Sequence, residues 1–303
     1  MTKNVFITGG LGQDGKILSN LLISKKVKLN VFFRNKKRII KNKKINYIYS
    51  NLKNKKKIDK IFKKNKPDIV VHLASNNPSF NQKSNKIFFK ENMLTTKNIF
   101  YSTFNNNINA KFIFCSSSQI FRKKTGVVNE KSETVINSSY TKFRINADNF
   151  MLNFKKKNKV NYTNAILFNH DSKYRNHKFI IPKLINNIKK EKINFVNNII
   201  KENIYADFSH AEDICNGIKK LIFTKLNFDK IIFSSNRNIS LNDIIFYILK
   251  KNKINMKIKK IKNKNKKGLI GSNKFAKQKL KWFPQKNIFI AAQEIYKSNP
   301  SKL

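Results

Sequence analysis

The stretch VFITGGLGQDG, residues 5–15, places a short hydrophobic run directly before a glycine-rich turn and a helical pattern. Its three glycines at positions 9, 12 and 15 have the GxxGxxG spacing. Glycine permits a tight strand-to-helix turn and lets backbone N–H groups approach a pyrophosphate at the helix N-terminus, where the dipole favours negative charge. The segment therefore predicts a dinucleotide site with contacts from Gly9, Gly12, Gln13, Asp14 and Gly15.

The sequence that follows this turn alternates short β-branched or aromatic runs with longer helical patterns. The predicted strands are residues 5–8, 29–33, 45–49, 69–73, 111–115 and 162–168. The predicted helices are residues 14–25, 57–64, 86–106 and 139–157. This order is typical of βαβ units, so we predict an α/β fold of the Rossmann type with a doubly wound parallel sheet.

The regular alternation weakens after residue 168, and shorter elements follow. We predict a dinucleotide-binding domain over residues 1–168, to which residues 207–236 return with a last strand at 231–234. Residues 169–303 would then mainly form a smaller C-terminal substrate-binding α/β domain. Such an arrangement predicts a ligand cleft between the two parts.

Composition limits the class of protein. The 303 residues are 40% hydrophobic, which is enough for a sizeable core, and they carry a net charge of +49. The lysines are spread over the whole length and accompany no nucleic-acid-reading motif, so we expect no nucleic-acid partner. No apolar run reaches the roughly 18 residues of a membrane span, and no signal-peptide pattern is present, so we expect a cytoplasmic protein without a membrane partner. Cys115 and Cys215 lie far apart, which predicts neither a disulfide nor a metal site.

The end of the second predicted strand indicates which nicotinamide cofactor the site prefers. Sites for NAD usually present an acidic residue to the ribose hydroxyls at this point, but here Arg34 is followed by Asn35, Lys36, Lys37 and Arg38. A guanidinium suits a 2′-phosphate. We therefore predict NADP as the cofactor, in preference to NAD.

Several motifs resemble those of the GDP-mannose 4,6-dehydratases, which belong to the extended short-chain dehydrogenases/reductases. GQDG at residues 12–15 resembles the start of that family, and LFNHDS at residues 167–172 resembles its substrate loop Leu-Phe-Asn-His-Glu-Ser. Further similar segments are HLAS at 72–75, SF at 79–80, SSS at 116–118, DFSHAED at 207–213 and LKWFP at 280–284. The resemblance covers nearly the whole chain and implies structural roles for His72 and His210.

By this resemblance, the reaction would convert GDP-mannose to a 4-keto-6-deoxy sugar through transient hydride transfer to bound NADP. Tyr140 would accept the proton of the C4 hydroxyl, and Ser117 would orient the sugar oxygen. The expected contacts to the nucleotide-sugar substrate come from Ser117, Asn169, Arg175 and Lys183. Further expected cofactor contacts come from Asn51, Leu52, Leu73, Ala74, Ser75, Tyr140 and Arg144.

Four positions depart from the family pattern. Gln119 stands where the dehydratases have the glutamate that removes the C5 proton, and an amide has no useful basicity. Arg144 stands in place of the lysine of Tyr-x-x-x-Lys; it shares a helix face with Tyr140, whereas Lys142 does not. Ala206 replaces an arginine before the aspartate of DFSHAED. Ser272 replaces an aspartate in LIGS at residues 269–272.

These departures leave three hypotheses open. The first is a dehydratase in which Ser117, Gln119, Tyr140 and Arg144 form an altered catalytic set. The second is a reductase or epimerase for a related nucleotide sugar, which needs Ser117, Tyr140 and a cation but no carboxylate at position 119. The third is a non-catalytic paralogue that binds NADP or a sugar nucleotide. The resemblance also suggests a homo-oligomer, which the sequence does not establish.

Overall fold

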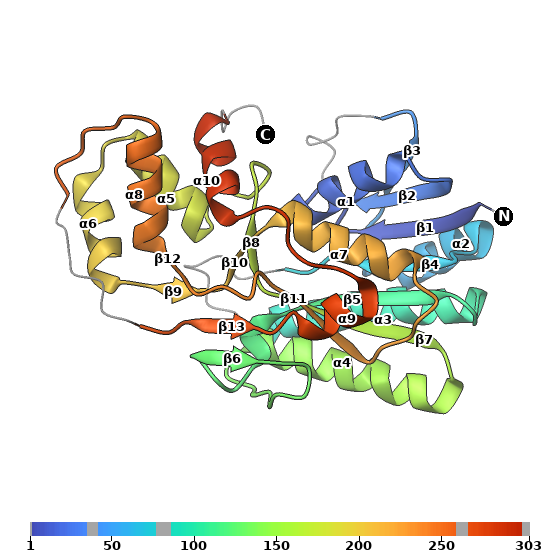
Figure 1. The fold of residues 1–303 in the computed structure, drawn as a ribbon. Coiled ribbons are helices and arrows are strands. Elements are labelled where there is room, and N and C mark those ends of the chain that lie inside the picture. Colours follow the sequence, from blue (N-terminus) through green and yellow to red (C-terminus); the bar gives the residue numbers. More distant parts are fainter. Residues whose placement is uncertain (1, 35–41, 77–85, 259–265, 299–303) are drawn as a thin grey trace. The chain divides into compact units, whose positions relative to one another are not determined.

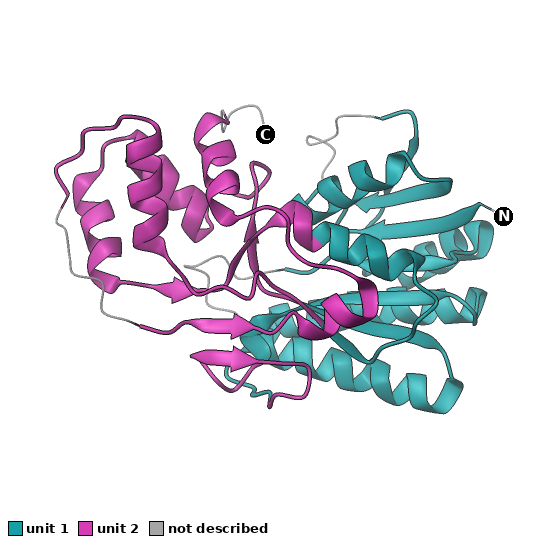
Figure 2. Ribbon diagram, viewed as in Figure 1, with its two compact units in different colours: residues 1–120, 134–166, 215–231 teal, residues 121–133, 167–214, 232–303 magenta. Residues whose placement is uncertain are grey.

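Short β-branched and aromatic runs form the strands of the computed structural model, which describes residues 2–34, 42–76, 86–258 and 266–298. The chain divides into two units, which Figure 2 shows in different colours. Unit 1 comprises residues 1–120, 134–166 and 215–231. Unit 2 comprises residues 121–133, 167–214 and 232–303.

A seven-stranded parallel sheet forms the centre of unit 1, in the order β11-β7-β5-β4-β1-β2-β3 (Figure 1). Its strands are β1 (Lys3–Thr8), β2 (Val27–Phe33), β3 (Ile45–Tyr49), β4 (Ile69–His72), β5 (Lys111–Ser117), β7 (Asn161–Leu167) and β11 (Lys230–Phe233). The order reverses between β1 and β4, which start the two halves of the sheet. In open α/β sheets, ligands bind beyond the carboxyl ends of the strands at such a reversal.

Helices cover both faces of this sheet. They are α1 (Gln13–Ile23), α2 (Lys55–Asn65), α3 (Lys86–Asn106), α4 (Ser139–Asn158) and α7 (Ala211–Phe223). On one face, aromatic side chains of the strands and of α2, α3 and α4 form a buried cluster that includes Phe6, Phe62, Phe100 and Phe143. Alternate strand residues such as Ile7 are also fully buried and face the opposite side, where Figure 1 shows α1 and α7.

Unit 2 combines helices with three short two-stranded pairings. Its helices are α5 (Ile180–Lys189), α6 (Ile193–Glu202), α8 (Leu241–Lys251), α9 (Lys274–Leu280) and α10 (Ile288–Lys297). Its strands are β6 (Gly126–Val128), β8 (Asn169–Asp171), β9 (Tyr205–Ala206), β10 (Phe208–His210), β12 (Ile239–Ser240) and β13 (Leu269–Gly271). Strands β8 and β10 pair in parallel, as do β6 and β13, whereas β9 and β12 are antiparallel. Buried isoleucines and leucines of α5, α6, α8 and α10 form its core.

The structure confirms the predicted fold class. Each strand predicted up to residue 168 is present within a few residues of its expected bounds, and residues 230–233 return to the edge of the sheet. Within the described residues, none of the helices combines the length and apolar character needed to cross a membrane.

Candidate functional site

The glycine-rich turn between β1 and α1 is built by close backbone contacts that exclude larger side chains. Gly9 has φ +72°, and a Cβ atom there would lie 2.9 Å from the amide nitrogen of Ala74. A Cβ at Gly15 would lie 2.5 Å from the carbonyl oxygen of Gly9. Gly12 is the N-cap residue of α1, and its N–H donates to Gly9 O at 3.0 Å. The backbone geometry of this turn therefore requires glycine at positions 9 and 15.

This turn fits a pyrophosphate group. The first turn of any α-helix has N–H groups without intrahelical acceptors, and its dipole favours an anion. At Gly12, the N-cap of α1, a Cβ would meet only Gly9 O within 4 Å, at 3.3 Å, so the space beyond this residue is open. Gln13 is buried and donates to the carboxylate of Asp14 at 3.0 Å. The turn thus has the geometry and the polarity that the phosphates of a dinucleotide require.

The ends of β1 and β4 are tied together beside this turn. Thr8 Oγ1 accepts a hydrogen bond from Ala74 N at 3.2 Å and lies 2.8 Å from His72 Nδ1. His72 Nε2 lies 3.0 Å from Thr96 Oγ1 on α3. Complete burial, with a smaller contribution from the charge of Arg144, lowers the pKa of His72 to about 3. His72 is therefore neutral and buried, in agreement with the structural role that the resemblance implies, and it orders the segment that contains Leu73, Ala74 and Ser75.

Arg34 lies exposed at the end of β2, and its guanidinium donates to Asn76 Oδ1 at 3.1 Å. Asn76 is itself held by Asn92 of α3, which accepts from Asn76 N at 2.9 Å and donates to Asn76 O at 3.2 Å. The guanidinium predicted to bind the 2′-phosphate is thus tethered to the loop after β4. The basic residues 35–38 and the SF motif at 79–80 lie outside the described residues.

Asn51 and Leu52 form the loop that follows β3. Asn51 Oδ1 accepts from Lys53 N at 3.1 Å, and the Leu52 carbonyl accepts from the side chain of Asn98 at 3.0 Å. Both predicted cofactor residues therefore lie at the carboxyl end of a sheet strand, where a dinucleotide is expected.

Tyr140 and Arg144 lie one turn apart on α4. This helix starts with a capping box in which Ser138 and Thr141 exchange hydrogen bonds between their side chains and backbones. Both Tyr140 and Arg144 are buried, and the Arg144 guanidinium carbon lies 5.1 Å from the centroid of the Tyr140 ring. The ammonium of Lys142 instead lies over the Phe89 ring, 5.3 Å from the ring centroid. The structure therefore assigns Arg144, and not Lys142, as the cation beside Tyr140.

The Arg144 guanidinium also bonds to protein groups. It donates to the carbonyl of Cys115 at 2.5 Å and to Ser75 Oγ at 2.7 Å. It also lies 5.5 Å from the ring centroid of Phe114. Arg144 thus connects α4 to the end of β5 and to the loop after β4.

Ser117 ends β5, and residues 118–120 continue as one turn of 3-10 helix. The hydroxyl of Ser117 accepts from Gln119 N at 3.3 Å, and Gln119 is exposed. Position 119 therefore presents an amide that cannot accept a proton from carbon.

The predicted substrate residues of unit 2 lie on β8 and on the segments that follow it. Asn169 starts β8 and is exposed. Arg175 Nε lies 3.2 Å from Asp171 Oδ1, and its guanidinium stacks on Phe179 with 3.6 Å to the ring centroid. Lys183 on α5 has its ammonium 5.4 Å from the ring of Phe195. Asp171 and Phe179 therefore limit the freedom of Arg175.

His210 is a structural residue of unit 2. It is buried, and its Nδ1 accepts from Glu212 N at 3.1 Å at the start of α7. Its Nε2 lies 3.4 Å from a carboxylate oxygen of Glu294 on α10. These contacts connect β10 to two helices, in agreement with the structural role that the resemblance implies for His210.

The glycine turn after β1 and the Tyr140–Arg144 pair both lie within a segment that matches a known protein family. The model of the NAD-dependent epimerase/dehydratase family matches residues 5–230. The chain belongs to this family.

Solved structures similar to this chain share its fold. One is the dTDP-glucose 4,6-dehydratase of Bacillus anthracis in complex with NAD, with a TM-score of 0.83, 16% identity and coverage of 97% of this chain and 96% of that chain. A UDP-glucuronic acid 4-epimerase of Bacillus cereus with UDP-glucuronic acid and NAD has a TM-score of 0.83, 17% identity and coverage of 97% and 98%. RMD of Pseudomonas aeruginosa with NADPH has a TM-score of 0.81, 16% identity and coverage of 100% and 99%. No curated protein sequence matches the chain.

Some residues that hold the end of β4 and the loop after it in place were not predicted from the sequence. Thr8 and Thr96 hold His72, and Asn92 holds the backbone of Asn76. Thr8 directly precedes the glycine turn, which is a signal that could have found it. Asn92 and Thr96 lie inside a long helix, and no pattern in the sequence indicates that they face the loop after β4.

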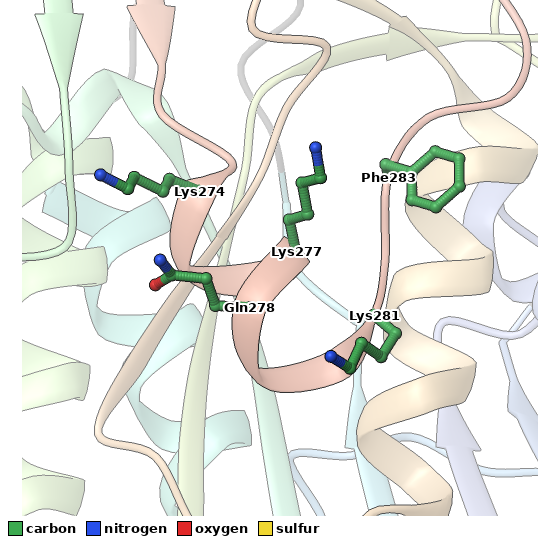
Figure 3. Close-up of a pocket in the computed structure, with 5 residues that line it drawn as sticks. All are labelled: Lys274, Lys277, Gln278, Lys281 and Phe283. Carbon is green, nitrogen blue, oxygen red and sulfur yellow. The ribbon is translucent and has the colours of Figure 1, made fainter.

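A hollow of about 450 Å³ lies on unit 2 around α9. It is lined by Lys274, Lys277, Gln278, Lys281 and Phe283 (Figure 3). Lys277 extends on the side of the Phe283 ring, whereas Lys274 and Gln278 point the other way. The polar groups therefore do not converge on one point, and none of the predicted site residues lines this hollow.

Proposed function

We propose that this chain is an NADP-dependent enzyme that acts at a sugar carbon of a nucleotide sugar. The first candidate reaction is the conversion of GDP-mannose to its 4-keto-6-deoxy product. The observation that carries the proposal is the buried pair of Tyr140 and Arg144, which is bonded to the ends of the strands beside the glycine-rich turn. The GQDG and LFNHDS motifs favour GDP-mannose among the nucleotide sugars.

The residues that would hold the cofactor follow from the strand ends. Gly9 and Gly15 would shape the turn, Gly12 would leave room for the pyrophosphate, and Arg34 would bind the 2′-phosphate. When bound, the nicotinamide accepts a hydride from the sugar and returns it. The similar structures from Bacillus anthracis and Pseudomonas aeruginosa contain NAD and NADPH, respectively, which supports a nicotinamide cofactor without deciding between the two.

Three residues of the chain would handle the sugar hydroxyl. The phenol oxygen of Tyr140 would take the hydroxyl proton as the hydride leaves the carbon. Arg144 places positive charge over the Tyr140 ring, where it stabilises negative charge that develops on the oxygen. Ser117 would hydrogen-bond to the sugar oxygen and orient it. Asn169, Arg175 and Lys183 would bind the rest of the nucleotide sugar.

Gln119 favours a second candidate, a reductase or epimerase for a related nucleotide sugar. Dehydration requires a base at C5, and the exposed amide of Gln119 cannot serve as one. Reduction or epimerisation requires the hydroxyl chemistry of Tyr140 and Ser117, a cation and the nicotinamide hydride, but no carboxylate at position 119. The family description and the neighbouring structures include both dehydratases and epimerases.

Product analysis separates these candidates. Purified protein is incubated with NADP and GDP-mannose, and in parallel with NADPH and a 4-keto nucleotide sugar. A 4-keto-6-deoxy product supports the dehydratase, and net consumption of NADPH with the keto sugar supports the reductase. An epimer of the supplied sugar supports the epimerase. The Tyr140→Phe variant should abolish each of these activities, and a wild-type protein that turns over none of the substrates would leave only a binding role.

Cofactor choice is tested by comparing the dissociation constants of NADP and NAD. The proposal expects tighter binding of NADP to the wild type, and loss of this preference in Arg34→Ala. The exposed Arg122, which pairs with Glu133, supplies an Arg122→Ala control that removes the same charge from unit 2. Tighter binding of NAD to the wild type would contradict the role given to Arg34.

A further inference from the structure

A rigid turn after β11 presents Arg237 to solvent. Asp207 is completely buried, and its carboxylate accepts from Ser235 N at 2.8 Å, Ser235 Oγ at 2.6 Å and Asn236 N at 3.0 Å. Asn236 adopts the left-handed conformation with φ 57°, and Ser235 Oγ accepts from Arg237 N at 3.2 Å. These contacts fix the backbone that carries Arg237, whose side chain is exposed.

The guanidinium of Arg237 differs from those of the other described arginines. Arg34 bonds to Asn76, Arg122 to Glu133, Arg144 to Cys115 and Ser75, and Arg175 to Asp171. Within the part of the chain that the structure describes, the Arg237 side chain makes neither a hydrogen bond nor an ion pair. A permanently charged fork on a fixed backbone, with no acidic side chain paired to it, is suited to bind an external anion.

The position of the turn in the fold also indicates a ligand. β11 is the neighbour of β7 in the sheet, and Phe168 N donates to Phe233 O at 3.1 Å where both strands end. The chain then continues from one strand end to Asn169 and from the other to Arg237. Both residues therefore follow the carboxyl ends of adjacent strands, which is the edge where ligands bind in such sheets.

A second strand pairing relates Arg237 to a cation that this chain lacks. Ala206 stands where the dehydratases that the sequence resembles have an arginine. Ala206 pairs with Ile239 across the antiparallel β9 and β12, and Arg237 precedes Ile239 by two residues. Arg237 therefore lies on the segment that leads into the strand paired with the position of the missing arginine.

We propose that Arg237 binds a phosphate of the nucleotide-sugar diphosphate. This inference rests on the proposed function, because it requires that the chain binds a sugar nucleotide. Guanidinium pairs with phosphate through two parallel hydrogen bonds, so Arg237 would recognise the diphosphate and not the base or the sugar.

Calorimetry with GDP and with guanosine tests this role, in saturating NADP so that the dinucleotide site is filled. Arg237→Ala should weaken GDP binding by about tenfold or more, as expected for loss of a hydrogen-bonded charge pair, and leave guanosine binding unchanged. Arg237→Lys should weaken GDP binding less than Arg237→Ala does. The double variant Ala206→Arg with Arg237→Ala should recover part of the affinity. Lys201→Ala, at an exposed lysine of α6, is the charge-matched control and should bind GDP like the wild type.

The outcomes separate this inference from the proposed function. If the wild type binds GDP, UDP or dTDP and Arg237→Ala binds it equally well, Arg237 does not bind the diphosphate and the proposed function stands. If the wild type binds none of the three diphosphates, both the proposed function and this inference are wrong. If Arg237→Ala weakened the binding of GDP and of guanosine equally, the inference would also be contradicted, because guanosine has no phosphate for Arg237 to contact.

Discussion

The guanidinium of Arg144 donates to the hydroxyl of Ser75 at 2.7 Å and thereby joins helix α4 to the loop that follows β4. The same guanidinium donates to the carbonyl of Cys115 at the end of β5. An ammonium group is a compact donor on a flexible chain and does not reproduce this planar, two-sided contact. Arginine at this position is therefore part of the local structure as well as the cation beside Tyr140.

Substitution of Arg144 should reduce stability. Arg144→Ala removes two hydrogen bonds from a buried site and leaves a cavity, which we expect to lower the free energy of unfolding by roughly 2–4 kcal/mol. Arg144→Lys should lose about half as much, because the ammonium keeps one of the two contacts. Urea unfolding monitored by circular dichroism measures both values. A lysine variant as stable as the wild type would show that position 144 only supplies charge.

Gln119→Glu should add dehydratase activity without a cost in stability. The side chain is exposed, so the free energy of unfolding should change by less than about 0.5 kcal/mol. A carboxylate at this position supplies the base that the amide lacks, and we expect formation of the 4-keto-6-deoxy product to rise by on the order of 100-fold. Gln119→Asn is the control without a carboxylate. An equal rate in all three proteins would exclude position 119 from the proton transfer.

Gly9→Ala should disrupt the turn and cofactor binding together. The new Cβ would contact the backbone of Ala74, and the positive φ adds about 1–2 kcal/mol of strain. Gly126 is a matched control, since it also has positive φ but a Cβ there would meet nothing within 4 Å. Gly126→Ala should cost only the strain and retain NADP binding. Equal NADP affinity in Gly9→Ala and the wild type would place the cofactor away from this turn.

His72 should make the protein less stable as the pH falls. Its pKa is about 3 in the folded state and 6.5 in its ordinary environment, so the unfolded chain binds the proton first. The contribution of His72 is complete above pH 6.5 and is lost as the pH falls from 6.5 towards 3. Burial raises the pKa of Asp207 to about 6, which acts in the opposite direction between pH 3.8 and 6. Only the difference between wild type and variant therefore isolates His72.

The test is to measure the free energy of unfolding of the wild type and of His72→Asn across this range. The wild type should lose more stability than the variant between pH 6.5 and about pH 4.5. Parallel curves for the two proteins would show that His72 is not buried in its neutral form.

The fold was predictable because its elements are encoded locally. β-branched and aromatic runs indicated the strands of the sheet. The glycine-rich turn, in which the backbone leaves no room for a Cβ at Gly9 or Gly15, indicated the end of the first strand. The short strands of unit 2 were not predictable in this way, since β9 and β12 have two residues each and depend on pairing with distant segments.

The candidate site was predictable only in part. Motif spacing identified Tyr140 and Arg144 as neighbours, and the structure shows the guanidinium over the ring. The partners of Arg144 could not be inferred, because Ser75 and Cys115 reach it through tertiary packing across 69 and 29 positions. Arg237 was not singled out, since in a chain with 65 basic residues only the buried Asp207 shows that its turn is fixed.

The most direct test of the proposed function follows a label from the sugar to the product. GDP-mannose that carries deuterium at C4 is incubated with the protein and NADP, and the products are analysed by mass spectrometry and NMR. Hydride transfer at C4 predicts deuterium at C6 of a 4-keto-6-deoxy product if the chain is a dehydratase, or at C4 of an inverted sugar if it is an epimerase. Recovery of unchanged substrate, both from this sugar and from C4-labelled UDP-glucose and dTDP-glucose, would contradict the proposal that the chain oxidises a nucleotide sugar at C4.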